Sequence, residues 1–173
     1  MSLAKTKNIL NKYWVGIIAV CVAVYASALF WRYGTGRIFI QGLVLLFVLI
    51  YASVSDIRTR TVGDFVSVQI LILTLIYFPI DKLLSSIAGA TIILVLQVLL
   101  TIVSRLKMGG ADIKITTAAA FLLGIEKGLS FYCMGFVLAM LYALIHSLKM
   151  KGANVGTPMI PFFSIGILIM FLV

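Results

Sequence analysis

Charged residues are scarce in this chain of 173 residues: they make up 11% of it, whereas hydrophobic residues make up 63%. A soluble domain of similar size is about half apolar and about a quarter charged. One globular core cannot bury so large an apolar excess, so the composition excludes a soluble enzyme or binding module. A bilayer buries it instead, in spanning helices of roughly 20 apolar residues each.

Cysteine and histidine are also rare, with two cysteines and one histidine. Cys21 and Cys133 stand alone in apolar stretches with no C-x-x-C pattern, which argues against a zinc site and a disulfide framework. The net charge of +9 raises the question of nucleic acid. The basic residues lie between apolar runs, however, so membrane topology explains them better, and we expect no nucleic-acid partner.

Apolar residues fill most of the chain in long continuous runs. The runs do not alternate with a period of two, which favours helices over a barrel. We predict an all-α polytopic membrane helix bundle with about seven transmembrane helices. The predicted runs are Trp14–Trp31, Ile38–Val54, Phe65–Ile80, Leu83–Val103, Gly110–Ile125, Gly128–Leu148 and Pro158–Val173.

Lysine and arginine between the runs predict the orientation, because cytoplasmic loops collect them. A cytoplasmic N-terminus places ten basic residues inside: Lys5, Lys7, Lys12, Arg58, Arg60, Arg105, Lys107, Lys114, Lys149 and Lys151. It leaves four outside: Arg32, Arg37, Lys82 and Lys127. The C-terminus is then extracytoplasmic. The first run, with Ala26-Ser27-Ala28 near its end, also fits a cleavable signal peptide; we favour a retained helix, and the orientation of the rest is the same either way.

Acidic residues number only five, and three of them have simple structural interpretations. Asp81 and Glu126 each precede a lysine in a short outer turn. Asp64 follows Gly63 and precedes an apolar run, where an aspartate is a good helix N-cap.

Asp56 and Asp112 stand at the cytoplasmic ends of two apolar runs. One interpretation is a juxtamembrane charge paired with Arg58 or Lys114. The other is function, since ionisable groups at membrane depth are costly. Two facing carboxylates in a low-dielectric site retain one proton and can activate a water against an amide carbonyl, as in aspartic proteases. The positive N-terminus of its helix favours ionised Asp112, and the negative C-terminus of its helix favours protonated Asp56, although the following arginines oppose this.

Two motifs surround these aspartates. Residues 56–62 read D-I-R-T-R-T-V, and residues 109–114 read G-G-A-D-I-K. Gly109 and Gly110 let the backbone bend and a substrate strand approach closely. Lys114 is either a tuning charge for Asp112 or a side chain that reaches the headgroups.

These motifs resemble those of the type IV prepilin peptidases, intramembrane aspartyl proteases of the G-x-G-D class. The first resembles an aspartate followed by basic residues, the second resembles G-x-G-D-x-K, and the proline-containing last run resembles the helix that ends the family's membrane domain. Ala111 replaces the second glycine, and Gly63-Asp64 replaces the usual Pro-Asn. The resemblance implies a six-helix catalytic part in residues 38–173, and residues 1–37 would add a cytoplasmic tail and one extra helix.

The resemblance implies a peptidase that removes the basic leader of pilin-like membrane precursors at the cytoplasmic face. Asp56 and Asp112 would be catalytic, without a metal or other cofactor. The supporting residues would be Arg58, Gly109, Gly110, Ala111 and Lys114. The cysteine-rich insertion of the methylating members is absent from the sequence, which leaves a peptidase-only form. The alternatives are an inactive relative that assists pilus or secretion-system assembly and, less favoured, a small ion-coupled carrier; the oligomeric state stays open.

Overall fold

Helices make up nearly all of the chain that the structure describes. The structure is a computed structural model that describes residues 3–76, 80–104, 109–149 and 158–173. Its elements follow the apolar runs of the sequence, because a helix satisfies its own backbone hydrogen bonds in an apolar solvent. In chain order they are α1 Leu3–Tyr33, α2 Arg37–Thr59, α3 Phe65–Ile76, the 3₁₀ turn η1 Ile80–Lys82, α4 Leu83–Ser104, α5 Gly110–Lys149 and α6 Ile160–Leu172.

The all-α prediction is confirmed for the described residues, but the predicted count of seven spanning helices is not. Within the part of the chain that the structure describes, three helices are long and apolar enough to cross a membrane: Arg37–Thr59, Ile80–Val103 and Gly110–Leu148. Shorter apolar helices cover Ile18–Tyr33, Phe65–Ile76 and Ile160–Leu172. The third predicted run extended to Ile80, whereas α3 ends at Ile76 and Ile80 begins η1.

Helix α5 is broken inside its span at Gly124. This residue has φ 79° and ψ −178°, a conformation that is essentially restricted to glycine. The two halves fold back on each other. A Cβ added at Gly128, after the break, would lie 3.5 Å from the Cα of Ala120, before it. Two separate runs were predicted here, with a turn at Glu126; the break lies two residues earlier. Ser85 of α4 supports it by accepting a hydrogen bond from the Ile125 N–H at 3.2 Å.

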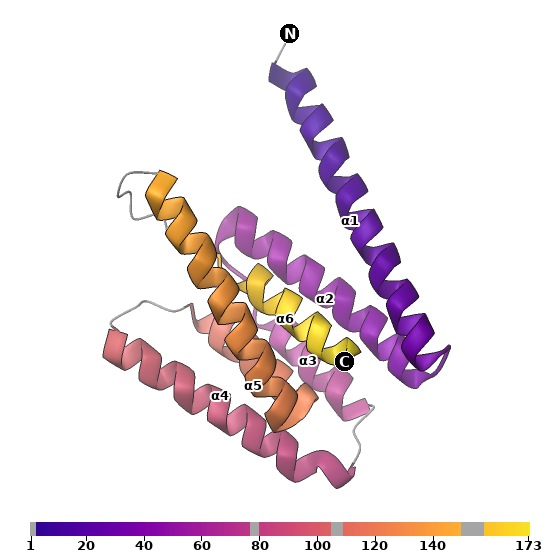
Figure 1. Ribbon diagram of the computed structural model, residues 1–173, viewed down its shortest axis with the longest axis vertical. Helices are drawn as coiled ribbons and strands as arrows, with labels where there is room; N and C mark the ends of the chain where they lie inside the picture. The colour runs from indigo at the N-terminus through magenta and orange to yellow at the C-terminus, as the bar shows by residue number, and fades with distance from the viewer. Residues whose placement is uncertain (1–2, 77–79, 105–108, 150–157) are drawn as a thin grey trace.

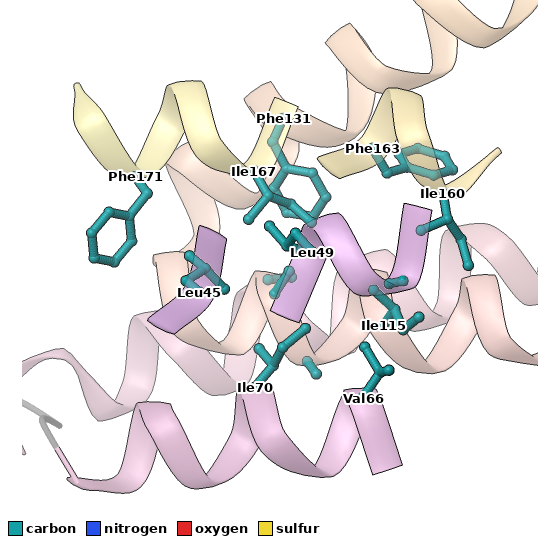
Figure 2. Close-up of a cluster of buried hydrophobic side chains, with 14 of the residues drawn as sticks. Leu45, Leu49, Val66, Ile70, Ile115, Phe131, Ile160, Phe163, Ile167 and Phe171 are labelled. Carbon is teal, nitrogen blue, oxygen red and sulfur yellow. The ribbon is translucent and has the colours of Figure 1, made fainter. Parts of the chain in front are cut away.

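The hydrophobic core lies between α2, α3, α5 and α6 (Figure 2). Leu49 of α2, Ile70 of α3, Phe131 of α5 and Ile167 of α6 have no exposed surface. Helix α6 approaches α5 closely at Gly166, where a Cβ would lie 2.7 Å from the Phe131 carbonyl oxygen. Packing among these four helices therefore fixes where the end of each helix lies relative to the others.

Helices α1 and α4 lie outside this group (Figure 1). Helix α4 packs against α5, while the N-terminal half of α1 projects away from the other helices. The C-terminal end of α1 binds the end of α6: Arg32 donates a hydrogen bond to the Val173 carbonyl at 2.6 Å, and the Tyr33 hydroxyl donates to the Phe171 carbonyl at 3.1 Å. These bonds satisfy carbonyl groups that a helix end leaves unpaired.

Candidate active site

Asp56 lies near the C-terminal end of α2 and points into the bundle, with an exposed fraction of 9%. The helix ends just after it because Arg60 adopts a left-handed conformation, with φ 56°, and donates its N–H to the Asp56 carbonyl at 3.1 Å. The Ser55 hydroxyl donates to the Thr61 carbonyl at 2.8 Å and holds the following turn against the helix. Arg58 is exposed on this turn, so the arginine that follows Asp56 in the motif does not share its buried position.

The carboxylate of Asp56 binds the start of α6. Its Oδ2 accepts a hydrogen bond from the Ile160 N–H at 3.2 Å, and so caps a helix whose own N-cap residue, Met159, makes no side-chain cap bond. One turn away, the Ser53 hydroxyl donates to the Ser164 hydroxyl at 3.0 Å. Asp56 therefore faces the positive end of α6 as well as the negative end of α2. The dipoles of the helix ends therefore do not separate the roles of Asp56 and Asp112.

Asp112 lies in the first turn of α5 and is partly buried. Its backbone N–H donates to the Gly109 carbonyl at 3.0 Å, which begins the helix, and its own carbonyl accepts from the Thr116 hydroxyl at 2.7 Å. A Cβ at Gly109 would lie 3.0 Å from the Asp112 carboxylate oxygen, whereas a Cβ at Gly110 would meet nothing within 4 Å. Gly109 therefore leaves room for the carboxylate, and Gly110 borders open space. Ala111 packs against the core, so its methyl group is accommodated.

The fold brings the two aspartates together. Their carboxylates, from α2 and α5, are close enough to interact electrostatically. The site lies at the end of the bundle where α2 ends and α6 begins. Asp56 and Asp112 therefore lie at the same end of the bundle.

Lys114 has a different partner from the two that were considered. Its Nζ lies 2.7 Å from Oδ2 of Asp64, and both side chains are largely exposed, so the ion pair joins the starts of α5 and α3 at the surface. Helix α3 begins directly after Asp64, as predicted, and the Asp64 carbonyl accepts hydrogen bonds from the Val68 N–H at 3.3 Å and the Ser67 hydroxyl at 2.7 Å. The third carboxylate is thus paired with Lys114 at the surface of the molecule.

Two structural partners of the aspartates were not identified from the sequence. The Ile160 N–H that binds Asp56 is a backbone group and carries no side-chain signal; only Pro158 and Pro161 mark a helix start nearby. The Thr116 hydroxyl, which binds the Asp112 carbonyl, lies four residues along the same helix, a spacing that the sequence does show. Among the described residues, no three His, Cys, Asp or Glu side chains form a group that could hold a metal ion.

A model of the type IV leader peptidase family matches residues 43–144, well over half of the chain. The chain belongs to the type IV leader peptidase family. Family membership identifies it as a peptidase, and its long apolar helices identify it as a membrane protein. Comparisons with curated proteins and with solved structures found no match.

The leader peptidase match covers both aspartate motifs and the Asp64–Lys114 pair. It stops within the second half of α5, so α6 lies outside it, although the resemblance was expected to extend to Val173. The hydrogen bond from Ile160 nevertheless ties α6 to Asp56, and α6 is part of the same site.

Proposed function

We propose that this leader peptidase is an intramembrane aspartyl endopeptidase that removes the basic leader from type IV prepilin-like precursors at the cytoplasmic membrane face. The proposal is supported by the placement of Asp56 and Asp112, which come from two different helices and two separate motifs and lie near enough to influence each other electrostatically. Family membership supports the class of reaction.

The two carboxyl groups share one proton, as close carboxylates in a site of low dielectric do. A water molecule lies between them. The ionised carboxylate takes a proton from this water as the water oxygen attacks the scissile carbonyl carbon. The protonated carboxyl group donates its proton to the carbonyl oxygen. As the tetrahedral intermediate collapses, the C–N bond breaks and the leaving nitrogen takes the proton that the first carboxylate received from the water. One hydroxyl of the intermediate returns its proton to the other carboxylate, so the product is a carboxylic acid and the pair again shares one proton.

The surroundings of each aspartate suit this chemistry. The Ile160 N–H fixes one oxygen of Asp56, which holds the carboxylate in one orientation toward Asp112. The open space beside Gly110 admits an extended substrate segment next to Asp112. The exposed apolar helices would let the apolar segment of a precursor lie alongside the enzyme in the bilayer. The proposed substrate has a short basic leader that ends in glycine, followed by such an apolar helix.

Co-expression with a candidate prepilin tests this function. The unmodified chain is expected to shorten the precursor by the length of its leader on a gel, and the Asp56→Asn and Asp112→Asn variants are expected to leave it intact at equal amounts in the membrane. An inactive relative would give no cleavage with any prepilin offered. A carrier would instead show flux across vesicles that depends on both aspartates.

A further inference from the structure

A chain of buried polar side chains leads from α4 to the first turn of α5. Gln97 of α4 has no exposed surface, and its Nε2 donates a hydrogen bond to the Thr116 hydroxyl at 2.6 Å. Thr116 has an exposed fraction of 1%, and its hydroxyl donates to the Asp112 carbonyl at 2.7 Å. The amide of Gln97 is therefore connected through one hydroxyl to the backbone of Asp112.

The Thr116 hydroxyl has one hydrogen, and the hydrogen bond from Gln97 determines toward which acceptor that hydrogen is oriented. A hydroxyl that accepts a bond from an amide N–H directs its own proton elsewhere. Here the proton goes to the Asp112 carbonyl, with the Ile113 carbonyl at 3.3 Å as a second, longer contact. A threonine bond to the carbonyl four residues earlier bends a helix locally. Gln97 thus acts on the direction of the turn that presents the Asp112 carboxylate.

This turn has little support of its own. It begins at Gly109 and Gly110, and glycine holds a helical backbone less firmly than any other residue except proline. A Cβ at Gly110 would meet nothing within 4 Å, so no neighbouring element packs there. The buried side of the turn, where Thr116 meets α4, adds lateral support to the packing of Ala111 against the core and the Lys114–Asp64 ion pair.

Tyr132, in the second half of α5, lies next to the side chain of Gln97. The Tyr132 hydroxyl interacts with the Gln97 side chain and has an exposed fraction of 3%. In the part of the chain that the structure describes, neither Gln97 Oε1 nor Tyr132 Oη has a hydrogen-bond partner. A phenolic O–H and an amide oxygen are complementary, and buried polar groups are nearly always satisfied, either directly or through one water molecule. Tyr132 is therefore the neighbouring group that can orient the amide of Gln97, by pairing with its oxygen.

We propose that Gln97 and Thr116 are positioning residues that hold the first turn of α5 so that Asp112 faces Asp56, with Tyr132 orienting the amide of Gln97. This inference rests on the proposed function, because it gives the network a role in leader cleavage. It makes α4, which carries no part of either motif, a supporting wall of the active site.

Thr116→Val tests the network, because it removes the hydroxyl and keeps the shape of the side chain. We expect a fall in kcat of about 10- to 100-fold from the misplaced carboxylate, with KM nearly unchanged. Thr116→Ser keeps the hydroxyl and is expected to restore kcat. Gln97→Leu is expected to give a similar fall, and Gln97→Leu with Thr116→Val is expected to be no worse than either change alone, since both break the same chain.

Thr74→Val is the matched control. Thr74 is equally buried, with an exposed fraction of 2%, and its hydroxyl donates to the Ile70 carbonyl at 2.8 Å, four residues earlier, as in Thr116. It lies in α3, away from this network, so its variant is expected to keep kcat. Equal losses for Thr74→Val and Thr116→Val, or a Thr116→Val variant with normal kcat, would overturn the positioning role. Should Thr116→Val fail to insert into the membrane, Tyr132→Phe tests the network at Tyr132 instead. A normal kcat in this variant would count against the network.

The two proposals fail in different ways. If the unmodified chain cleaves, Asp112→Asn is inactive and Thr116→Val is fully active, only the positioning role is wrong. If the unmodified chain does not cleave, or Asp112→Asn retains activity, the proposed function is wrong and the positioning role is wrong with it.

Discussion

At the scale of single residues, Asp56 has two partners that make different demands. The Ile160 N–H needs a hydrogen-bond acceptor, which any carboxylate or amide oxygen provides. The proposed reaction with Asp112 needs a group that exchanges a proton, which an amide cannot do. A substitution that keeps the acceptor and removes the proton exchange therefore separates a structural cap from a catalytic group.

The Asp56→Asn and Asp56→Ala variants are expected to differ in stability but to show the same loss of cleavage activity. Asparagine can still accept the Ile160 N–H, so its variant should unfold in detergent close to the unmodified protein. Alanine leaves a buried N–H unpaired, which costs about 1–3 kcal/mol of unfolding free energy. Both variants should lose cleavage. An active, stable Asp56→Asn variant would show that Asp56 only caps α6.

The two glycines before Asp112 predict different kinetic effects. Alanine at Gly109 would press on the Asp112 carboxylate at 3.0 Å and displace it, so we expect a lower kcat. Alanine at Gly110 enters open space where the substrate is proposed to approach, so we expect a higher KM and a smaller change in kcat. Steady-state kinetics on a leader-containing peptide would measure both. If Gly109→Ala instead raised KM and Gly110→Ala instead lowered kcat, the substrate would lie on the other side of the turn.

At the scale of elements, the fold depends on where its helices break and how closely they approach. The sequence predicts most of the helix positions, because continuous apolar runs locate the helices and Gly63-Asp64 locates the start of α3. It places the break in α5 at Glu126, since a charged pair usually marks a turn, whereas the backbone needs a glycine with positive φ and breaks at Gly124. The match between Asp56 and the Ile160 N–H depends on the packing of α2 against α6, and no local pattern indicates it.

Gly124→Ala tests the break in α5. The positive φ is strained for alanine, and the added Cβ would lie 2.9 Å from the Ser85 hydroxyl oxygen, so we expect a loss of about 1–3 kcal/mol in unfolding free energy. Gly128→Ala is the control, since its Cβ would lie at ordinary contact distance, 3.5 Å, from Ala120 and alanine favours a helix. Thermal unfolding in detergent compares the two. Equal stability of both variants would mean that α5 does not need this break.

At the scale of the whole molecule, three of the basic residues that the sequence assigns to the outer side lie near one another. Arg32, Lys82 and Lys127, all assigned to the outer side, interact electrostatically, and Arg32 binds the carbonyl of the C-terminal Val173. The site formed by Asp56 and the start of α6 lies at the other end of α6. Charge alone predicts from the sequence which end of the bundle is cytoplasmic, but it does not indicate the contacts made at each end.

Reporter fusions test the side on which the site lies. Fusions after Arg60 and after Lys107 are both expected to report the cytoplasm, and a fusion after Val173 is expected to report the outside. Lys107 lies outside the described residues, so its side rests on the sequence alone. An external reading after Arg60 would reverse the orientation and separate the site from the cytoplasmic leader of a precursor.

The central claim is that Asp56 and Asp112, and not Asp64, form the catalytic pair. The most direct measurement compares leader cleavage by three purified variants, each with one of these aspartates changed to asparagine, and by the variant with both Asp56 and Asp112 changed. Asp56→Asn and Asp112→Asn should each lose about 10²–10⁴-fold in kcat, and the double variant should lose little more, because the pair acts as a unit. Asp64→Asn should cleave nearly normally, because it removes only an exposed ion pair worth about 0–1 kcal/mol. An inactive Asp64→Asn variant beside an active Asp56→Asn variant would contradict the account, because Asp112 would then have the wrong partner.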